Sequence, residues 1–344
     1  MSNAAIITGG AGFIGSHLAE RLCAAGRRVL LVDDLSTGRR QNVEHLLGDG
    51  VEIVHGRAAE VLQDPSVFKG VTEVYHLAAA VGVKLIVDDP AGMIATNIDD
   101  TIVVLRACAA ADVPVLVASS SEVYGKCPVL PLREDMDLVF GPTTASRWSY
   151  GLTKALDEHL AIDLARRDGL KSVVVRLFNT IGPRQVGRYG MVAPRFVSRA
   201  CAGQPLEVYG DGGQTRAFCD ARDVVAAMTG LMAAPDGAAF GGVFNVGNDE
   251  QVTIRGLAEL VIERAAAAGR SGSVIQTVPY EAVYGEGFED PPHRLPDVSR
   301  LRDAINWSPT FTLEQTIDAL IADECSGVPF RGSSLTDPAA APTD

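Results

Sequence analysis

The fold is decided near the start of the chain, by Ala4-Ala5-Ile6-Ile7-Thr8-Gly9-Gly10-Ala11-Gly12-Phe13-Ile14-Gly15. The apolar run 4–8 predicts a buried strand, and the apolar spacing over 13–25, stopped by Gly26, predicts a helix. Between them, residues 10–15 form the G-x-G-x-x-G pattern in the strand–turn–helix setting that it requires. Glycines there permit a tight turn and a close backbone approach to a pyrophosphate, which the helix N-terminus also favours. The stretch therefore predicts a dinucleotide site.

An acidic residue stands where the second strand of such a unit ends. Asp33 closes Leu30-Leu31-Val32-Asp33-Asp34 and lies eighteen residues after Gly15. Its carboxylate can accept hydrogen bonds from the ribose hydroxyls and would repel a 2′-phosphate, so NAD is predicted over NADP. Asp34 is the competing candidate. Arg39 and Arg40 lie nearby and keep NADP open as an alternative.

Apolar runs alternate with helical stretches through the first half of the chain, which predicts an α/β fold with a doubly wound parallel sheet. The further predicted strands are 29–32, 51–54, 71–76, 113–118 and 172–177, and the main helices are 99–111 and 150–167. After Phe178, glycines and prolines break the chain into shorter pieces. We expect a Rossmann domain over 1–178 with a returning segment near 222–248, a smaller C-terminal subdomain from 179–221 and 249–325, and a disordered tail over 326–344.

Composition limits the classes of partner. The 344 residues carry a net charge of -13, which argues against binding to nucleic acid or to an anionic membrane. The six cysteines are scattered without metal-ligand spacing, so we expect reduced thiols and no metal site. The first residues do not resemble a secretory signal, and a cytoplasmic location is expected. An anionic diphosphate substrate would need its own local arginines against this overall charge.

A candidate general base lies on the second long helix. Tyr150 and Lys154 are four residues apart, so their side chains share one helix face. A free phenol is a poor base at neutral pH, but a neighbouring ammonium favours the phenolate. The pair is therefore suited to removing an alcohol proton during hydride transfer.

Several stretches together follow the pattern of a known family: Thr8-Gly9-Gly10-Ala11-Gly12-Phe13-Ile14-Gly15, Asp33, His76-Leu77-Ala78-Ala79, Ser119-Ser120-Ser121 and Tyr150-x-x-x-Lys154. They resemble the extended short-chain dehydrogenase/reductase superfamily, and within it the nucleotide-sugar epimerases, dehydratases and decarboxylases. The resemblance covers about residues 6 to 320. It implies tightly bound NAD, a nucleotide-diphosphate sugar as substrate, a C-terminal subdomain that binds it, and a homodimer formed through the helices 99–111 and 150–167.

The resemblance also implies roles for individual residues. Tyr150 and Lys154 match the catalytic pair, Ser120 matches the hydroxyl that binds the sugar's C4 hydroxyl, and Asn97 matches a residue that structures the site. The implied cofactor-binding set is Gly9, Gly12, Phe13, Ile14, Gly15, Asp33, Leu77, Ala78 and Ala79, with Tyr150 and Lys154. The implied substrate-binding set is Val81, Lys84, Asn179, Arg195, Tyr209, Arg216 and Arg294, of which the last two hold the diphosphate. One departure is Gly56-Arg57-Ala58, where relatives carry an adenine-contacting Asp after the Gly.

The stretches that bear on the type of reaction fall into two sets, which resemble different members of this superfamily. Ser120-Ser121-Glu122-Val123-Tyr124-Gly125 resembles the UDP-glucuronate decarboxylases, and it makes Ser121 and Glu122 further catalytic candidates. The stretches 147–150, 285–290 and 293–296 resemble the bacterial decarboxylase of lipid A modification. Residues 80–84 instead resemble the sugar loop of 4-epimerases.

These resemblances leave a ranking of reactions. Ser121 replaces the Asp that dehydratases use, so dehydration is disfavoured; Glu122 also has a structural reading, as a cap for backbone N–H groups. An NAD-dependent nucleotide-sugar 4-epimerase is placed ahead of a nucleotide-uronate decarboxylase. A redox sensor that binds NAD without catalysis is a third reading, but it has no need of a general base such as Tyr150.

Overall fold

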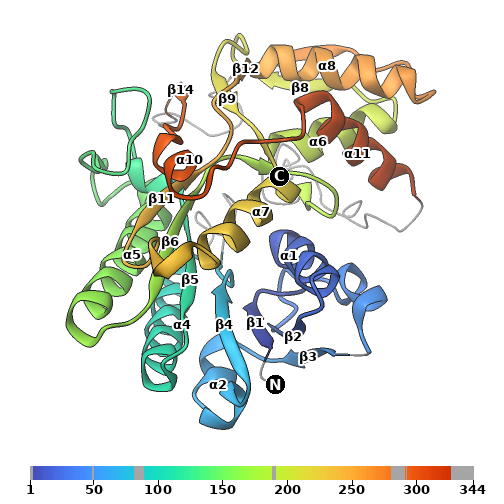
Figure 1. Cartoon of the computed structure of the whole chain (residues 1–344). Helices are drawn as coiled ribbons and strands as arrows, with labels where there is room; N and C mark the ends of the chain where they lie inside the picture. Colours follow the sequence, from blue (N-terminus) through green and yellow to red (C-terminus); the bar gives the residue numbers. More distant parts are fainter. Residues whose placement is uncertain are drawn as a thin grey trace, which may run out of the picture.

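A parallel seven-stranded sheet forms the centre of the molecule (Figure 1). The computed structural model describes residues 3–48, 50–80, 89–187, 191–279, 291 and 293–326. The strand order is β11-β6-β5-β4-β1-β2-β3. The strands are β1 (Ala4–Thr8), β2 (Arg28–Asp33), β3 (Val51–His55), β4 (Val71–His76), β5 (Val115–Ser120), β6 (Ser172–Leu177) and β11 (Val243–Val246). The predicted doubly wound α/β fold is thus confirmed.

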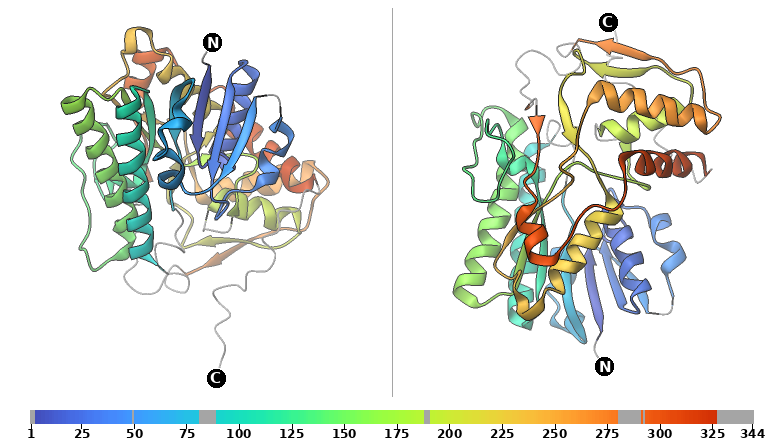
Figure 2. Two further views of the ribbon diagram at one scale, coloured as in Figure 1. Left: turned by 90° about the horizontal axis from the view of Figure 1, so that it is seen from below. Right: turned by 45° about the horizontal axis from the view of Figure 1, so that its top comes forward.

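Helices cover both faces of this sheet. One face carries α1 (Phe13–Ala24), α7 (Ala221–Met232) and α10 (Ser299–Ile305), and the other α2 (Ala58–Leu62), α4 (Pro90–Ala111) and α5 (Ser149–Asp168). Figure 2 shows α4 and α5 side by side on their face. Neighbouring residues of β1 point to opposite faces, as the period of a strand requires. Ile7 therefore packs with Leu18 of α1 in one apolar cluster, while Ile6 packs with Val104 of α4 in another.

A smaller subdomain lies beyond the carboxyl ends of the sheet strands (Figure 1). Its helices α6 (Val192–Cys201), α8 (Ile254–Ala267) and α11 (Leu313–Cys325) enclose a third apolar cluster around Phe196, Leu257 and Ile317. Two small sheets complete it: β8 (Leu206–Tyr209) pairs with β13 (Ile275–Val278), and β9 (Thr215–Ala217) lies between β12 (Gln251–Thr253) and β14 (His293–Arg294). A third pair, β7 (Thr180–Ile181) with β10 (Cys219–Asp220), lies where the chain enters and leaves it.

Some predicted boundaries differ from the structure. Helix α4 begins at Pro90, nine residues before the predicted start, because Asp89 caps it by accepting a hydrogen bond of 2.9 Å from the N–H of Gly92. Strand β5 begins at Val115, after Pro114, which has no N–H to donate to a neighbouring strand. Of the predicted tail, residues 327–344 lie outside the described part of the chain.

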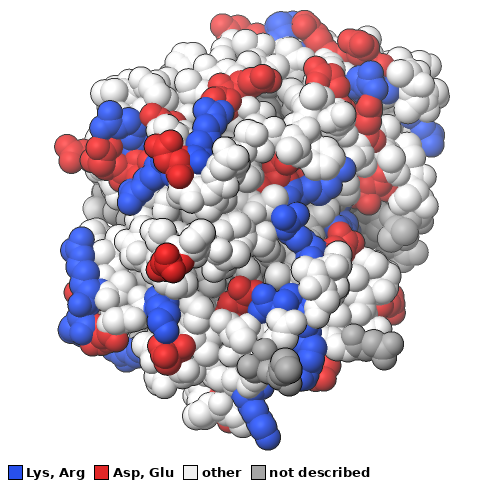
Figure 3. All heavy atoms as spheres, in the orientation of Figure 1, with Lys and Arg blue, Asp and Glu red and all other residues white. Residues whose placement is uncertain are grey.

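Charges of both signs are interspersed over the face seen in Figure 3, although the whole chain is acidic. In the described ranges, no helix is both long and apolar enough to cross a membrane.

Candidate active site and cofactor-binding turn

Two glycines at the turn after β1 leave no room for a side chain. Gly9 has φ +69°, and a Cβ there would lie 2.9 Å from the backbone nitrogen of Ala78. A Cβ on Gly15 would lie 2.2 Å from the carbonyl oxygen of Gly9, so α1 packs directly against the turn. Helix α1 begins at Phe13 and its N-cap, Gly12, supplies no side-chain hydrogen bond. The first N–H groups of the helix therefore remain suited to the pyrophosphate of NAD.

Asp33 ties this turn to the end of β2. Its Oδ2 accepts from the N–H of Ala11 at 2.9 Å, and its Oδ1 accepts from that of Leu35 at 2.8 Å. Burial raises the pKa of Asp33, and these two hydrogen bonds oppose the rise. Each carboxylate oxygen keeps acceptor capacity for a ribose hydroxyl. Asp34 is exposed and accepts from Ser36 instead, so the geometry favours Asp33 as the ribose contact.

Arg57, the departure from the family pattern, has a structural partner. Its Nη2 lies 3.0 Å from Oδ1 of Asp100 on α4, which also accepts from the N–H of Ala59 at 3.2 Å. The backbone N–H of Arg57 donates to Glu60 at 3.2 Å, which caps α2. Arg57 therefore connects the beginning of α2 to α4, at the position where relatives place the adenine contact.

The predicted catalytic residues come together at the carboxyl end of β5. Ser120 ends this strand and hydrogen-bonds to Tyr150 in the first turn of α5. Burial raises the pKa of Tyr150 and the Lys154 ammonium opposes that rise. Lys154 is itself buried, and its Nζ lies 3.1 Å from Oδ2 of Asp157, one turn further along the helix. The arrangement can take a proton from an alcohol that reaches the phenol oxygen.

His76, at the end of β4, is a buried histidine close to Lys154. It is buried between Thr8 and Thr101, with its Nδ1 at 2.8 Å from the hydroxyl oxygen of Thr8 and its Nε2 at 3.2 Å from that of Thr101. Burial, together with the charge of Lys154, lowers the pKa of His76 to about 3. The imidazole is therefore neutral near pH 7 and adds no charge to the catalytic pair.

Glu122 binds two arginines beside the predicted catalytic residues. It lies in η4 (Ser121–Tyr124), and Arg147 of η5 (Ser146–Trp148) donates to its two oxygens at 2.5 and 3.2 Å. Arg294 of β14 donates its Nη1 to Oε1 of the same carboxylate. Burial alone would raise the pKa of Glu122, but Arg294 and Arg147 hold it well below its usual range. Glu122 is therefore ionised at neutral pH and is poorly suited to donate a proton.

The two predicted diphosphate ligands lie next to each other. Arg216 of β9 and Arg294 of β14 are register partners in a parallel strand pair. Arg216 donates from Nη1 to the carbonyl of Thr215 at 2.8 Å. Arg294 is buried on Glu122, while its Nη2 has no hydrogen-bond partner among the residues that the structure describes. Arg294 thus binds Glu122 of η4 and lies beside Arg216, the other predicted diphosphate ligand.

Three of the remaining predicted substrate residues lie in the described part of the chain: Arg195, Tyr209 and Asn179. In the subdomain, the guanidinium of Arg195 stacks 4.4 Å from the ring centre of Tyr209 and hydrogen-bonds to its hydroxyl. Asn179 has φ +27° and donates to the carbonyl of Ala217 at 3.0 Å.

Asn97 of α4, which is predicted to structure the site, binds the backbone of Ala80. Its side chain accepts from the N–H of Ala80 at 2.7 Å and donates to the carbonyl of Ala80 at 3.1 Å. Val81, Lys84 and the stretch 285–290 lie outside the described residues.

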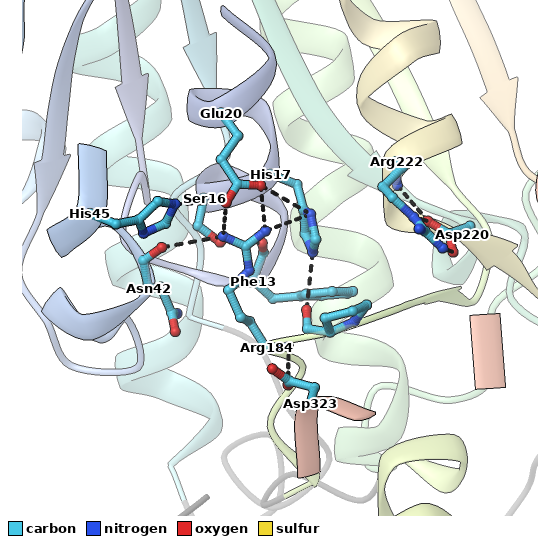
Figure 4. A network of polar contacts seen from close by, with 11 residues as sticks. Phe13, Ser16, His17, Glu20, Asn42, His45, Arg184, Asp220, Arg222 and Asp323 are labelled. Carbon is cyan, nitrogen blue, oxygen red and sulfur yellow. Dashed lines mark hydrogen bonds and ion pairs between the residues drawn. The ribbon is translucent and has the colours of Figure 1, made fainter. Parts of the chain in front are cut away.

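A polar network connects the cofactor helix to the subdomain (Figure 4). The guanidinium of Arg184, which follows β7, donates to the two oxygens of Glu20 at 2.9 and 2.7 Å and to Nδ1 of His17 at 2.7 Å, both on α1. The backbone N–H of Arg184 donates to Asp323 of α11 at 2.7 Å. Burial is the main cause of a lowered pKa at His17, which keeps the ring neutral as an acceptor for Arg184. One residue thus contacts both α1 and α11.

Three contributors to the site received no individual role from the sequence: Asp157, His76 and Arg147. His76 and Arg147 entered the sequence reasoning only as members of stretches that resemble relatives. Asp157 follows Lys154 by three residues, and this helical spacing was a usable signal. Arg147 meets Glu122 only through the fold. Among the described residues no cluster of His, Cys, Asp or Glu could hold a metal ion.

A Rossmann sheet with this glycine turn and a Ser–Tyr–Lys set at its carboxyl edge is typical of NAD-dependent enzymes. The family model described as the NAD dependent epimerase/dehydratase family matches residues 5–247, and the chain belongs to this family. It is 39% identical over 325 residues to the UDP-N-acetyl-alpha-D-glucosaminuronate decarboxylase of Bacillus cytotoxicus, covering 93% of this chain and 97% of that protein. UDP-glucuronic acid decarboxylase 1 of Danio rerio is 33% identical and is covered over 71% of its length, with 92% of this chain.

Two solved structures that resemble the chain are of 4-epimerases. The UDP-N-acetylglucosamine 4-epimerase of Methanobrevibacter ruminantium aligns with a TM-score of 0.82 at 28% identity, over 94% of this chain and 99% of that one. The UDP-glucuronic acid 4-epimerase of Bacillus cereus, solved with UDP-glucuronic acid and NAD, aligns with a TM-score of 0.80 at 25% identity, over 93% and 98%. These matches confirm the predicted superfamily and confirm NAD as the cofactor.

Proposed function

We propose that the chain is a decarboxylase of a UDP-linked uronate, which reverses the order of the two reactions expected from the sequence. Two relatives that are 39% and 33% identical to the chain are decarboxylases of such sugars. The structural observation that carries the proposal is the pairing of Glu122 with Arg147 and Arg294 close to Tyr150. Two guanidinium groups held at the catalytic tyrosine suit a sugar that carries its own carboxylate.

The chemistry begins at the C4 hydroxyl of the sugar. Bound NAD, held at the glycine turn and by Asp33, would supply the hydride acceptor for the oxidation of C4 and the hydride donor for its later reduction. Tyr150 takes the hydroxyl proton, Ser120 orients the hydroxyl, and the charge of Lys154 favours the phenolate. In the 4-keto uronate, the electron pair of the C5–C6 bond moves toward the C4 carbonyl as carbon dioxide leaves. The positive charges of Arg147 and Arg294 favour the enolate oxygen that results. C5 then takes up a proton from water, which restores the C4 ketone for reduction.

A 4-epimerase is the second candidate. The solved 4-epimerases align over almost the whole chain, and the stretch 80–84 resembles the loop of that group. Both candidates begin with the same oxidation by Tyr150 and differ only in what happens to the 4-keto sugar.

The experiment offers the purified enzyme four substrates: UDP-glucuronate, UDP-N-acetylglucosaminuronate, UDP-glucose and UDP-N-acetylglucosamine. We expect loss of carbon dioxide from a uronate by mass spectrometry and no reaction of the neutral sugars. Unchanged mass with an altered NMR spectrum would favour epimerisation, and inertness toward all four would contradict both proposals. Tyr150→Phe is the inactive control.

The cytoplasmic location and the homodimer stay predictions. The dimer proposal uses α4 and α5, which pack side by side, and Leu156 of α5 is 49% exposed although it is apolar. Sedimentation of Leu156→Glu should show a monomer if this face forms the interface.

A further inference from the structure

Asp157 is a buried carboxylate without a role in the chemistry described so far. Its side chain is fully buried, and Oδ2 lies 3.1 Å from Nζ of Lys154. Its Oδ1 has no hydrogen-bond partner among the residues that the structure describes. A buried carboxylate is costly unless it is paired, so the pair with Lys154 is what makes this position tolerable.

The other charged groups around Lys154 are already paired elsewhere. On α5, Glu158 binds Arg176 of β6 at 2.7 Å. From η4, Glu122 is held by Arg147 of η5 and by Arg294. These pairs leave Asp157 as the carboxylate that is bonded directly to the ammonium.

Two further elements contribute no competing charge. On α4, Asp100 pairs with Arg57, and on β4, His76 is neutral. Among the residues that the structure describes, Lys154 therefore forms its ion pair with Asp157.

The same carboxylate acts on Tyr150 with the sign opposite to that of Lys154. Burial raises the pKa of Tyr150, Lys154 lowers it, and the carboxylates of Glu122 and Asp157 raise it again. For Lys154, burial lowers the pKa, but Asp157 is the main reason that the pKa ends above its usual value. Asp157 therefore fixes the ammonium in its charged form while offsetting part of its effect on the phenol.

We propose that Asp157 is a positioning residue that holds the Lys154 ammonium on the inner face of α5 and offsets the charge by which Lys154 favours the Tyr150 phenolate. The inference rests on the roles proposed above for Tyr150 and Lys154. The pair is then tuned by a third member of the same helix, which sets how alkaline the solution must be before Tyr150 becomes a base.

The test titrates Tyr150 directly and needs no sugar substrate. Both the NAD-loaded parent protein and its Asp157→Asn variant carry Lys154→Arg, because a guanidinium stays charged when its carboxylate partner is removed, whereas a buried lysine can lose its proton. Each is titrated by the ultraviolet absorbance of phenolate against the same protein with Tyr150→Phe. The difference between the two titration curves reports Tyr150 alone, because the other six of the seven tyrosines are present in both proteins. We expect Asp157→Asn to move the titration of Tyr150 to lower pH by on the order of one unit, about a tenfold change in the dissociation constant.

A matched control removes a carboxylate from the same helix without touching the site. Asp163 pairs with Arg167 on the surface of α5, with 68% of its side chain exposed. Asp163→Asn, made in the same Lys154→Arg protein, should leave the titration of Tyr150 where it is in that parent. Asp157→Ala removes the same charge with a residue that favours helix, and it replaces the Asn variant if that one does not fold.

The outcomes separate clearly. A titration of Tyr150 that stays in place, or moves to higher pH, in a folded Asp157 variant would overturn the proposal. A shift to lower pH supports it even if no UDP-uronate is decarboxylated, because phenol ionisation is measured without turnover. A merely structural role of Asp157 would leave the titration of Tyr150 in place.

Discussion

Replacing Glu122 with Gln keeps the shape of the side chain and removes the charge on which two arginines converge. Glu122 accepts three hydrogen bonds from Arg147 and Arg294, and the three side chains are only 7–20% exposed, so solvent screens them weakly. Breaking a buried ion pair by removing one partner costs about 3–5 kcal/mol. The Gln carbonyl can still accept from one guanidinium, so we expect the low end, about 3 kcal/mol lost from the free energy of unfolding.

The same variant separates the steps of the reaction. Tyr150, Lys154 and Ser120 are unchanged, so C4 oxidation should continue. With the two guanidinium groups no longer held in place, the later loss of carbon dioxide should slow, and reduced cofactor should accumulate. Stopped-flow absorbance of NADH after mixing with excess UDP-glucuronate measures this accumulation, and urea unfolding measures the stability.

The matched control is Glu259→Gln, which makes the same change at an exposed position on α8. It should match the unmodified enzyme in both measurements. A Glu122→Gln enzyme with normal stability and normal product formation would refute the idea that this carboxylate organises the arginines. Normal epimerisation by that variant would instead support the second candidate reaction, since turning a keto sugar over needs space rather than a fixed pair of cations.

Further expectations concern single residues. Tyr150→Phe should retain NAD but slow C4 oxidation by roughly 10² to 10⁴, measured in a single turnover; near-normal turnover would contradict the shared mechanism. Asp33→Ala should weaken NAD binding and relax discrimination against NADP in calorimetry, and equal affinities in the unmodified protein would count against Asp33. Arg216→Ala should raise the apparent substrate constant by an amount worth roughly 2–4 kcal/mol, and an unchanged constant would place the diphosphate elsewhere. His76 has a pKa of about 3 in the folded protein against 6.5 as the ordinary value, so the unfolded chain binds more protons below pH 6.5. Its contribution to stability should be complete above that pH and fall by about 1.4 kcal/mol per unit on acidification; urea unfolding of His76→Gln should show a flatter slope between pH 7 and 5.

Local patterns carried most of what the sequence could predict. The glycine turn and Asp33 belong to one strand–turn–helix–strand unit, and Tyr150 and Lys154 to one helix face, so short-range spacing was enough. The cluster of Glu122, Arg147 and Arg294 joins three segments that only the fold brings together.

The two-residue strand β14 shows the same limit. It is too short to have any periodicity, yet its pairing with β9 places Arg294 beside Arg216. The early start of α4 was missed for a different reason, since its signal is one capping side chain, Asp89, and a proline.

The smaller subdomain is not one continuous piece of chain, and this limits how it can be exchanged. Strands β8 and β9 come before the return of the chain to the main sheet through α7 and β11, while their partners β13, β12 and β14 come after it. A single crossover between β9 and β12 in two homologous genes would therefore split both small sheets between parents, and one before β8 would also exchange α7 and β11 of the main sheet. A functional chimaera with new sugar specificity needs two coordinated exchanges, near 179–221 and 249–325, and must keep Arg184 with its partners on α1 and α11 from matching parents.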